Sequence, residues 1–544
     1  MSLVQVQTPR QRAPRKAAAT QTHQAYPFSA PIKGVDVSQP LPGGNPFTAV
    51  RMDNLIPRVL GCQLRKGFTR WVSNMGGEIR SLMAYHPPTG DAQLFAATST
   101  GAVFDVTIAK PASITPVPVL NVAGTVPGEW TSINFTSTEG VHVMLAVCLG
   151  VGLYKYDAVN GWVKILQGTA AGEIEGVDPA LFGYLTVFKN RLWFIEAGTT
   201  RCWYLPPGQF AGKATEFDFG AMLPNGGSVV GLVNWTFDGS AGVGLDNKFI
   251  VIADQGDVLV YQGTDPEAVD GFGVAGRWYI GRVPVGNRFF NLYGSDVAIL
   301  SERGMVFMSE LMRGQGFFEN PQIAQNINSE LAIQVASTLG SRYWEIAFVP
   351  HEQLIIINLP EYNAQNIQWA YEVNNKAFCN LRGLPMNTVA TMDGRTFIGD
   401  LVGNVWWAFQ GQSDGEVDGT PGTDLLGTVV TAFQPLGEGF RIKRFLMVRP
   451  SFISSSSPGV KAQLNKEWSL LLPDGAPAYL NAGENFWDQG SWDNAVWSGA
   501  TGNYEAWMGA NGAGRYGSLS MQVRGAADTI FIGWQALVEQ GGVL

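Results

Sequence analysis

A short pattern that occurs seven times between Leu94 and Phe409 limits most strongly what this chain can fold into. It consists of an apolar stretch, a turn containing Gly, Asp or Asn, and a second apolar or aromatic stretch. Glycine supplies the positive backbone angle of a tight turn, and the flanking β-branched and aromatic residues suit half-buried strands. Each copy is therefore predicted to be a β-hairpin. The copies span residues 94–106, 145–157, 191–205, 249–263, 297–309, 354–371 and 397–409.

The hairpins start roughly 40 to 60 residues apart, a period typical of four-stranded blades around an axis. We therefore expect an all-β protein with a β-propeller of six or seven blades. The spacing is irregular and no copy carries a WD or Kelch signature, so an ordinary β-sandwich with many hairpins is the alternative. Near residues 411–422 the pattern gives way to Gly, Asp, Ser, Thr and Pro, which indicates a domain boundary.

After this boundary, strands resume with apolar residues alternating with polar or small ones, as in SLSMQVRG and TIFIGWQALVE. This alternation predicts a C-terminal antiparallel β-sandwich. The expected organisation is a basic extended N-terminal arm at 1–35, a β-propeller at 36–420 and the sandwich domain at 421–544.

Composition indicates a large protein that buries part of its surface in an assembly. A chain of 544 residues is too long for one small core. Its charged fraction is 15%, well below the roughly 25% of an average soluble domain. Few solvated side chains then need to be desolvated on association, although a large all-β monomer is the alternative.

The cysteines and the apolar runs give no sign of a special compartment. Four cysteines lie far apart without a CxxC pair, so we expect reduced thiols rather than zinc ligands or disulfides. No stretch approaches the roughly 18 apolar residues of a membrane-spanning helix, and the N-terminus lacks the apolar core of a secretory signal. We expect synthesis in the cytoplasm and no membrane-spanning segment.

The N-terminal arm and the rest of the chain have opposite charges. No acidic residue precedes Asp36, whereas the arm carries five basic residues; because the whole chain has a net charge of −9, the remainder carries −14. The arm is rich in Gln, Ala, Thr and Pro, which favours disorder until a partner is bound. Its candidate contacts are nucleic acid phosphates or an acidic neighbouring subunit, and a solvated tail is the alternative. The residues that we single out are Arg10, Arg12, Arg15 and Lys16.

Three tryptophans near the C-terminus form a second candidate contact surface. Trp487, Trp492 and Trp497 recur at a spacing of five, which matches neither a helix nor a strand. In a loop such rings can anchor a partner or a sugar. Alternatively, they cap the core of the sandwich.

Two further segments have sequence patterns that predict local secondary structure. The stretch Arg51–Trp71, RMDNLIPRVLGCQLRKGFTRW, alternates apolar with basic residues and predicts two short strands packed by Phe68 and Trp71. Residues 326–338 have a polar start, Glu330 in the first turn and apolar residues available for packing, which predicts a short inserted helix.

The sequence gives little support for an enzyme. A GxGxxG motif occurs at Gly271, Gly273 and Gly276, but it follows a polar loop and leads into an expected strand, whereas a phosphate site needs a preceding strand and a following helix. The four histidines are isolated, and GxSxG and GxxxxGK[ST] motifs are missing. Ser491, Asp493 and Trp497 only partly match the Asp-box of sialidase propellers. We therefore expect no enzymatic activity, no cofactor and no bound metal, although a glycosidase with distant carboxylates remains an alternative.

Three segments resemble the tail nozzle proteins of short-tailed bacteriophages, also called packaged-DNA or head-to-tail stabilisation proteins. Residues 51–71 are similar to the opening of that family, and residues 351–381 to its strand of aliphatic residues ended by Leu-Pro and followed by a Tyr-containing strand. The run KRFLMVRP (443–450) and the tryptophan-rich segment are similar to its C-terminal region. The resemblance covers Asp36 to Leu544, and the basic arm departs from it.

The resemblance implies a structural protein of the virion tail: a ring, of six copies, that closes over the packaged DNA until infection. It implies a homo-oligomer, with adaptor or connector proteins and tail fibres or tailspikes as partners. Six copies would carry about −54 charges, six times the −9 of one chain, so we expect double-stranded DNA to pass without specific binding. A carbohydrate-binding propeller for host attachment is the alternative. Our candidate for a gate in the bore is the Gly-rich connection Gly239–Asn247.

Overall fold

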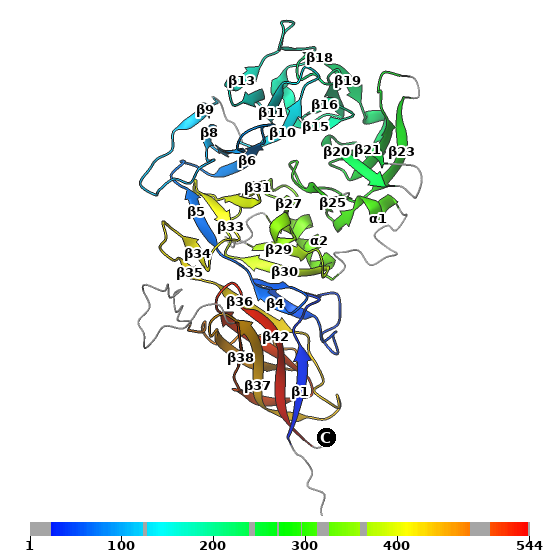
Figure 1. Cartoon of the computed structure of the whole chain (residues 1–544). Helices are drawn as coiled ribbons and strands as arrows, with labels where there is room; N and C mark the ends of the chain where they lie inside the picture. Colours follow the sequence, from blue (N-terminus) through cyan, green and yellow to red (C-terminus); the bar gives the residue numbers. More distant parts are fainter. Residues whose placement is uncertain are drawn as a thin grey trace, which may run out of the picture.

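The computed structural model describes residues 23–122, 128–238, 245–268, 271–294, 296–312, 326–359, 367–478 and 501–541. Figure 1 shows an elongated molecule with a β-propeller at one end and a β-sandwich at the other. The predicted fold class is confirmed, and a single sandwich built from all the hairpins is excluded.

Within the described residues, the propeller consists of six four-stranded blades and one three-stranded sheet, which follow one another around an axis in chain order and close when β31 packs against β6. The first four blades are β6 (Ile79–Tyr85), β7 (Gln93–Thr98), β8 (Ala102–Asp105) and β9 (Pro118–Asn121); β10 (Trp130–Thr136), β11 (His142–Cys148), β12 (Gly152–Asp157) and β13 (Gly161–Ile165); β15 (Phe182–Phe188), β16 (Arg191–Glu196), β17 (Arg201–Tyr204) and β19 (Thr215–Asp218); and β20 (Val229–Asp238), β21 (Leu245–Ala253), β22 (Asp257–Gly263) and β23 (Phe272–Tyr279). The three-stranded sheet contains β24 (Phe290–Tyr293), β25 (Asp296–Ser301) and β26 (Gly304–Phe307). The last two blades are β27 (Glu345–Val349), β28 (Leu354–Asn358), β29 (Ile367–Glu372) and β30 (Ala377–Arg382); and β31 (Thr388–Met392), β32 (Arg395–Gly399), β33 (Val405–Ala408) and β5 (Phe68–Val72).

All seven predicted strand pairs are present, as β7–β8, β11–β12, β16–β17, β21–β22, β25–β26, β28–β29 and β32–β33. Six of them provide the two middle strands of a four-stranded blade, and β25–β26 provide the middle and last strands of the three-stranded sheet. The turn between β21 and β22 illustrates why glycine is needed there. Gly256 has φ 95°, and a Cβ atom at this position would lie 2.2 Å from the Gly281 carbonyl oxygen. Both the backbone angle and the space therefore require glycine.

The ring is closed by strands from distant parts of the chain. β5 pairs antiparallel with β33, so residues 68–72 complete a blade whose other strands begin at Thr388. Aromatic side chains also pack between adjacent blades: the ring centroids of Trp193 on β16 and Phe249 on β21 are 4.9 Å apart. Such pairs add stability beyond the apolar area that they bury.

The sandwich has two antiparallel layers. One layer contains β1 (His23–Ser29), β3 (Leu55–Pro57), β4 (Cys62–Leu64), β37 (Lys443–Ser454), β39 (Gly502–Glu505), β40 (Met508–Gly514) and β42 (Ile530–Gln540). The other contains β2 (Ala49–Asp53), β36 (Leu426–Thr431), β38 (Gly459–Lys466) and β41 (Gly517–Arg524). β2 also pairs with β30, so this second layer continues into a propeller blade.

The strand pairing divides the N-terminal region differently from the expected boundaries at 36 and 421. Residues 23–29, expected within the arm, form β1 and pair with β42 of the sandwich. Residues 49–64, expected within the propeller, form strands of both sandwich layers, and Arg51–Trp71 contains four short strands rather than two. Local alternation of apolar residues identifies strands but does not identify the sheet that accepts them.

The remaining elements are short. The predicted helix is confirmed as α2 (Asn328–Ser337), although its N-cap is Ile327, without a capping side chain. The expected boundary near 411–422 contains β34 (Ser413–Glu416), which is followed by its partner β35 (Thr423–Asp424) and pairs with β5. The other elements are α1 (Met308–Met312), the 3-10 turns η1 (Pro179–Leu181), η2 (Gly220–Met222) and η3 (Pro350–Glu352), and the parallel pair β14 (Ile174–Glu175) and β18 (Gly212–Lys213).

Candidate functional site

The residues selected from the sequence do not form a site that can be described. Arg10, Arg12, Arg15, Lys16, Trp487, Trp492 and Trp497 all lie outside the described residues, as do residues 239–244 of the expected gate. Gly273 and Gly276 lie within strand β23, so the GxGxxG motif does not begin a helix, as anticipated. Charged side chains are instead gathered at two other places, the propeller axis and the junction between propeller and sandwich.

Arg288, just before β24, reaches across the propeller axis. Its Nη1 donates to Thr388 Oγ1 at 3.0 Å and faces Glu345 Oε2 at 3.4 Å. Its Nη2 donates to Ser81 Oγ at 2.6 Å and to the Trp130 carbonyl oxygen at 3.5 Å. These four partners belong to, or adjoin, β31, β27, β6 and β10, so one guanidinium connects four sheets besides its own.

Asn287 extends this connection. Its Nδ2 donates to Thr131 Oγ1 at 3.0 Å on β10 and to the Gly183 carbonyl oxygen at 3.1 Å on β15. Together Asn287 and Arg288 link six of the seven sheets of the ring. We call Asn287 and Arg288 the axial staple.

Two more ion pairs surround the staple at the end of the axis where the innermost strands begin. Arg80 Nε lies 3.2 Å from Glu78 Oε2, and Arg342 Nη1 lies 3.8 Å from Glu129 Oε2. The space enclosed between these residues and the staple is about 10 Å³, room for roughly one water molecule. The three guanidinium groups at this end of the axis are therefore balanced by three carboxylates.

Glu345 is the most buried carboxylate of the group. Burial raises its pKa, and the Arg288 guanidinium opposes this by favouring the ionised form. Burial also raises the pKa of Tyr343, with a contribution from the negative charge of Glu78. A buried carboxylate that keeps its charge depends on its partner, which makes Arg288 a determinant of propeller stability.

At the junction, Arg65 is fully enclosed and all of its donors are satisfied. Its side chain is 0% exposed. The Nε donates to Asn54 Oδ1 at 2.9 Å, and Nη1 and Nη2 bind the two Asp414 carboxylate oxygens at 2.7 and 2.6 Å. The remaining donors reach the carbonyl oxygens of Lys66 at 3.0 Å and Arg382 at 2.9 Å. This bidentate ion pair connects Arg65, which lies between β4 and β5, to Asp414 on β34.

Two other basic residues of the same stretch bind an acid of the propeller. Arg58 Nη2 and Lys66 Nζ lie 2.9 and 2.8 Å from the two oxygens of Glu352. Arg70 binds Asp418, and this hydrogen bond lowers the pKa of the Asp418 carboxyl. The stretch Arg51–Trp71 thus places Arg58 and Lys66 against the propeller, whereas Arg51 pairs with Asp53 on β2. Sequence reasoning identified the stretch but not these partners.

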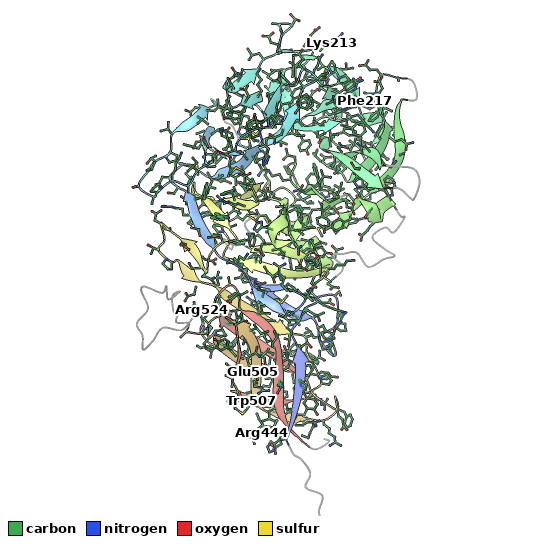
Figure 2. All side chains as sticks on the ribbon, viewed as in Figure 1. Lys213, Phe217, Arg444, Glu505, Trp507 and Arg524 are labelled. Atoms are coloured by element: carbon green, nitrogen blue, oxygen red, sulfur yellow. The ribbon has the colours of Figure 1, made fainter. Side chains whose placement is uncertain are left out.

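A cleft of about 710 Å³ lies beside this network, between the propeller and the sandwich. Two of the carboxylates that line it form ion pairs: Asp53 lies 2.7 Å from Arg51 and 3.0 Å from Arg382, and Asp424 lies 3.7 Å from Arg524. Figure 2 labels Arg524 near the junction, whereas Arg444, Glu505 and Trp507 lie farther along the sandwich. The cleft is therefore polar, and both of these carboxylates face an arginine.

Other site chemistry is sparse in the described ranges. No group of three or more His, Cys, Asp or Glu side chains there is placed to hold a metal ion. The four cysteines are buried and unpaired, and burial raises the pKa of Cys148 to about 12, so this thiol stays protonated. In the same part of the chain, no helix combines the length and apolar character needed to cross a bilayer.

Comparison with known proteins adds no family. No family model matches the chain, and no curated protein is similar to it in sequence. Three solved structures are similar at low identity: YCF48 bound to a D1 peptide (8% identity, TM-score 0.36, 62% of this chain and 93% of that one), PorZ of the type-IX secretion system of Porphyromonas gingivalis (12%, 0.37, 66% and 42%), and the β-propeller domain of Myceliophteria thermophila Cps50, or Swd1 (12%, 0.36, 62% and 99%). The fold assignment rests on the strand pairing of this chain itself.

Proposed function

We propose that this chain is a structural subunit of a virion tail, which forms the nozzle ring that retains the packaged genome and conducts it during ejection. The observation that carries the proposal is the direct connection between propeller and sandwich, in which β2 pairs with both β30 and β36. Buried ion pairs lie at the junction of propeller and sandwich, and the axial staple links six sheets of the propeller. A subunit that must keep its shape under the pressure of packaged DNA needs such connections between its parts.

Two of the segments that resemble nozzle proteins meet at the junction. Residues 51–71 supply Arg58, Arg65 and Lys66, and residues 351–381 supply Glu352 and Glu372. Lys443, the first residue of the third segment, is fully buried, and its Nζ donates to three carbonyl oxygens. The resemblance therefore lies on residues with structural roles, which is the pattern expected of a non-enzymatic scaffold.

The first test of this proposal is the assembly state. Purified protein, alone or mixed with its connector, should form a ring with an axial hole in electron micrographs. A ring of six copies has a mass of about 353 kDa, six times the 58.8 kDa chain, which light scattering can measure. A chain that stays monomeric both alone and with its connector would contradict the proposal.

The second test is the response to DNA. Because the chain has a net charge of −9, we expect no measurable binding to duplex DNA in a gel shift at about 0.15 M salt. A bore that bound phosphates tightly would slow the exit of the genome. Tight binding that weakens steeply with added salt would argue against a conduit and for a nucleic-acid-binding protein.

A further inference from the structure

The hairpin formed by β3 and β4 has apolar residues at its tip, where polar residues are usual. Backbone hydrogen bonds link Arg58 N to Gly61 O at 2.7 Å and Gly61 N to Arg58 O at 3.3 Å, so the loop narrows to Val59 and Leu60. Gly, Asn, Asp, Pro and Ser dominate such turns. Here the Val59 side chain is 81% exposed and that of Leu60 is 62% exposed. We call Val59 and Leu60 the apolar tip.

Arg58 fixes the apolar tip against the propeller. Its guanidinium donates to the Glu352 carbonyl oxygen and to Glu352 Oε2, both at 2.9 Å, and to Glu372 Oε1 at 3.3 Å. Glu372 ends β29, so the tip lies beside the turn that leads into β30 at Ala377. Because the basic neighbour of the tip is already paired, the tip presents apolar side chains from a fixed position. Such preorganisation lowers the entropic cost of binding.

The other end of the same hairpin borders the cleft between propeller and sandwich. Asn54, directly before β3, lines this cleft together with Arg382, the last residue of β30. The apolar tip and the cleft therefore lie at opposite ends of β30, on opposite sides of the junction. Figure 1 shows β30 crossing the molecule, with β34 and β35, which contribute to the cleft, on its left.

The cleft exposes apolar surface, whereas three of its carboxylates are paired. Asp53, Asp414 and Asp424 each face an arginine. Four of the residues that line the cleft are apolar and only half-buried: Pro385, Trp406, Leu426 and Leu472. Leu470 and Leu471 directly precede Leu472 and are exposed. A cavity of about 150 Å³ holds a benzene molecule, so the roughly 710 Å³ of the cleft have room for two aliphatic side chains.

A second copy of this chain is the occupant that fits the cleft. Each copy carries both an apolar tip and a cleft, and in both places ion pairs hold nearby charged groups while apolar side chains remain exposed to water. Burying these side chains against each other is favourable. Because the tip and the cleft lie on opposite sides, the contact is heterologous. Each added copy then leaves one tip and one cleft free until the series closes into a ring.

We propose that the apolar tip of one copy inserts into the junction cleft of the next copy and forms the contact between subunits. The proposal rests on the proposed function, and it assigns the surfaces through which neighbouring copies of the nozzle ring join.

Cysteine cross-linking of the full-length protein, alone or mixed with its connector, tests the contact directly. Leu60→Cys and Thr423→Cys place thiols on the tip and in the cleft, and the four native cysteines are buried. After treatment with bismaleimidoethane, the double variant should give a ladder of linked chains in denaturing gels, ending at six. Each single variant should stay monomeric on the gel, and an equal mixture of the two should stop at dimers. Absence of cross-links overturns the proposal, and so does a linked dimer of Leu60→Cys alone, which requires an isologous contact.

Val59→Asp tests the contribution of the apolar tip. The variant places a charge in an apolar contact, so association measured by light scattering should weaken about 10- to 100-fold. Val159→Asp, at the turn between β12 and β13, is the matched control: Val159 is 92% exposed, and association should stay unchanged. Both valines lie on the surface, so both variants should keep the urea midpoint of the wild type. Association that Val59→Asp leaves intact overturns the contact.

The cross-linking and the micrographs separate this contact from the proposed tail function. If the double variant forms rings in micrographs but does not cross-link, the contact is overturned and the nozzle ring is not. If linked chains form but never close into rings, the contact is supported and the nozzle function is contradicted.

Discussion

Replacing Arg65 with methionine should lower the free energy of unfolding by about 3 to 5 kcal/mol, the cost of breaking a buried ion pair on one side. Methionine fills a similar volume but supplies none of the five donated hydrogen bonds. Asp414 then keeps a carboxylate at the junction without its guanidinium. Urea denaturation followed by tryptophan fluorescence measures the change, since the tryptophans of the propeller report on its unfolding.

Two variants make this prediction specific. Arg65→Lys should recover only part of the lost stability, because an ammonium group has three donors and cannot bind both carboxylate oxygens in one plane. Arg51→Met is the control from the same stretch: its side chain is 40% exposed, and Asp53 retains Arg382, so we expect a loss within about 1 kcal/mol. If Arg65→Met costs no more than Arg51→Met, the junction is not held by this network.

The sequence predicts the middle strands of each blade because their signal is local. A glycine turn such as Gly256 and two apolar runs of about five residues identify a hairpin without reference to the rest of the chain. The inner and outer strands have no such signal. β24 (Phe290–Tyr293) and β9 (Pro118–Asn121) are four residues long and partly exposed, and they are strands only because a neighbouring strand pairs with them.

The other differences between the predicted and the observed structure arise where residues far apart in the sequence pair with each other. The stretch Arg51–Trp71 is visibly strand-like, but Arg65 meets Asp414, which is 349 residues away in the chain. A single sequence gives no local signal that two positions so far apart form an ion pair. The same limit applies to the expected boundary at residue 36, because β1 and β2 are assigned to the sandwich by their pairing with β42 and β36.

The axial staple was not foreseen for a related reason. In the sequence, Arg288 is a single basic residue between Asn287 and two phenylalanines, with no motif around it. Its role arises from the closure of the ring, which brings Ser81, Glu345 and Thr388 to one point on the axis. A residue at the centre of a closed ring contacts many sheets, so its importance depends on topology rather than on its local sequence.

Replacing Arg288 with methionine should therefore destabilise the propeller by about 3 to 5 kcal/mol at pH 7 to 8, and the loss should shrink in mild acid. Burial already raises the pKa of Glu345, and removal of the guanidinium raises it further. In the variant, the folded state then binds a proton more readily than the unfolded state does. Its stability relative to wild type should rise as the pH falls through the folded pKa towards the unfolded value near 4.5.

Urea midpoints of both proteins at several pH values between 5 and 8 test this dependence, and two further variants identify its origin. Arg288→Met/Glu345→Gln should be more stable at pH 8 than Arg288→Met alone, because the unpaired charge is gone. Arg282→Met removes a guanidinium that is 56% exposed and pairs with Glu302, so its cost should stay within about 1 kcal/mol. A loss for Arg288→Met that is the same at every pH would mean that hydrogen bonds to Ser81 and Thr388, rather than compensation of Glu345, account for the contribution of Arg288.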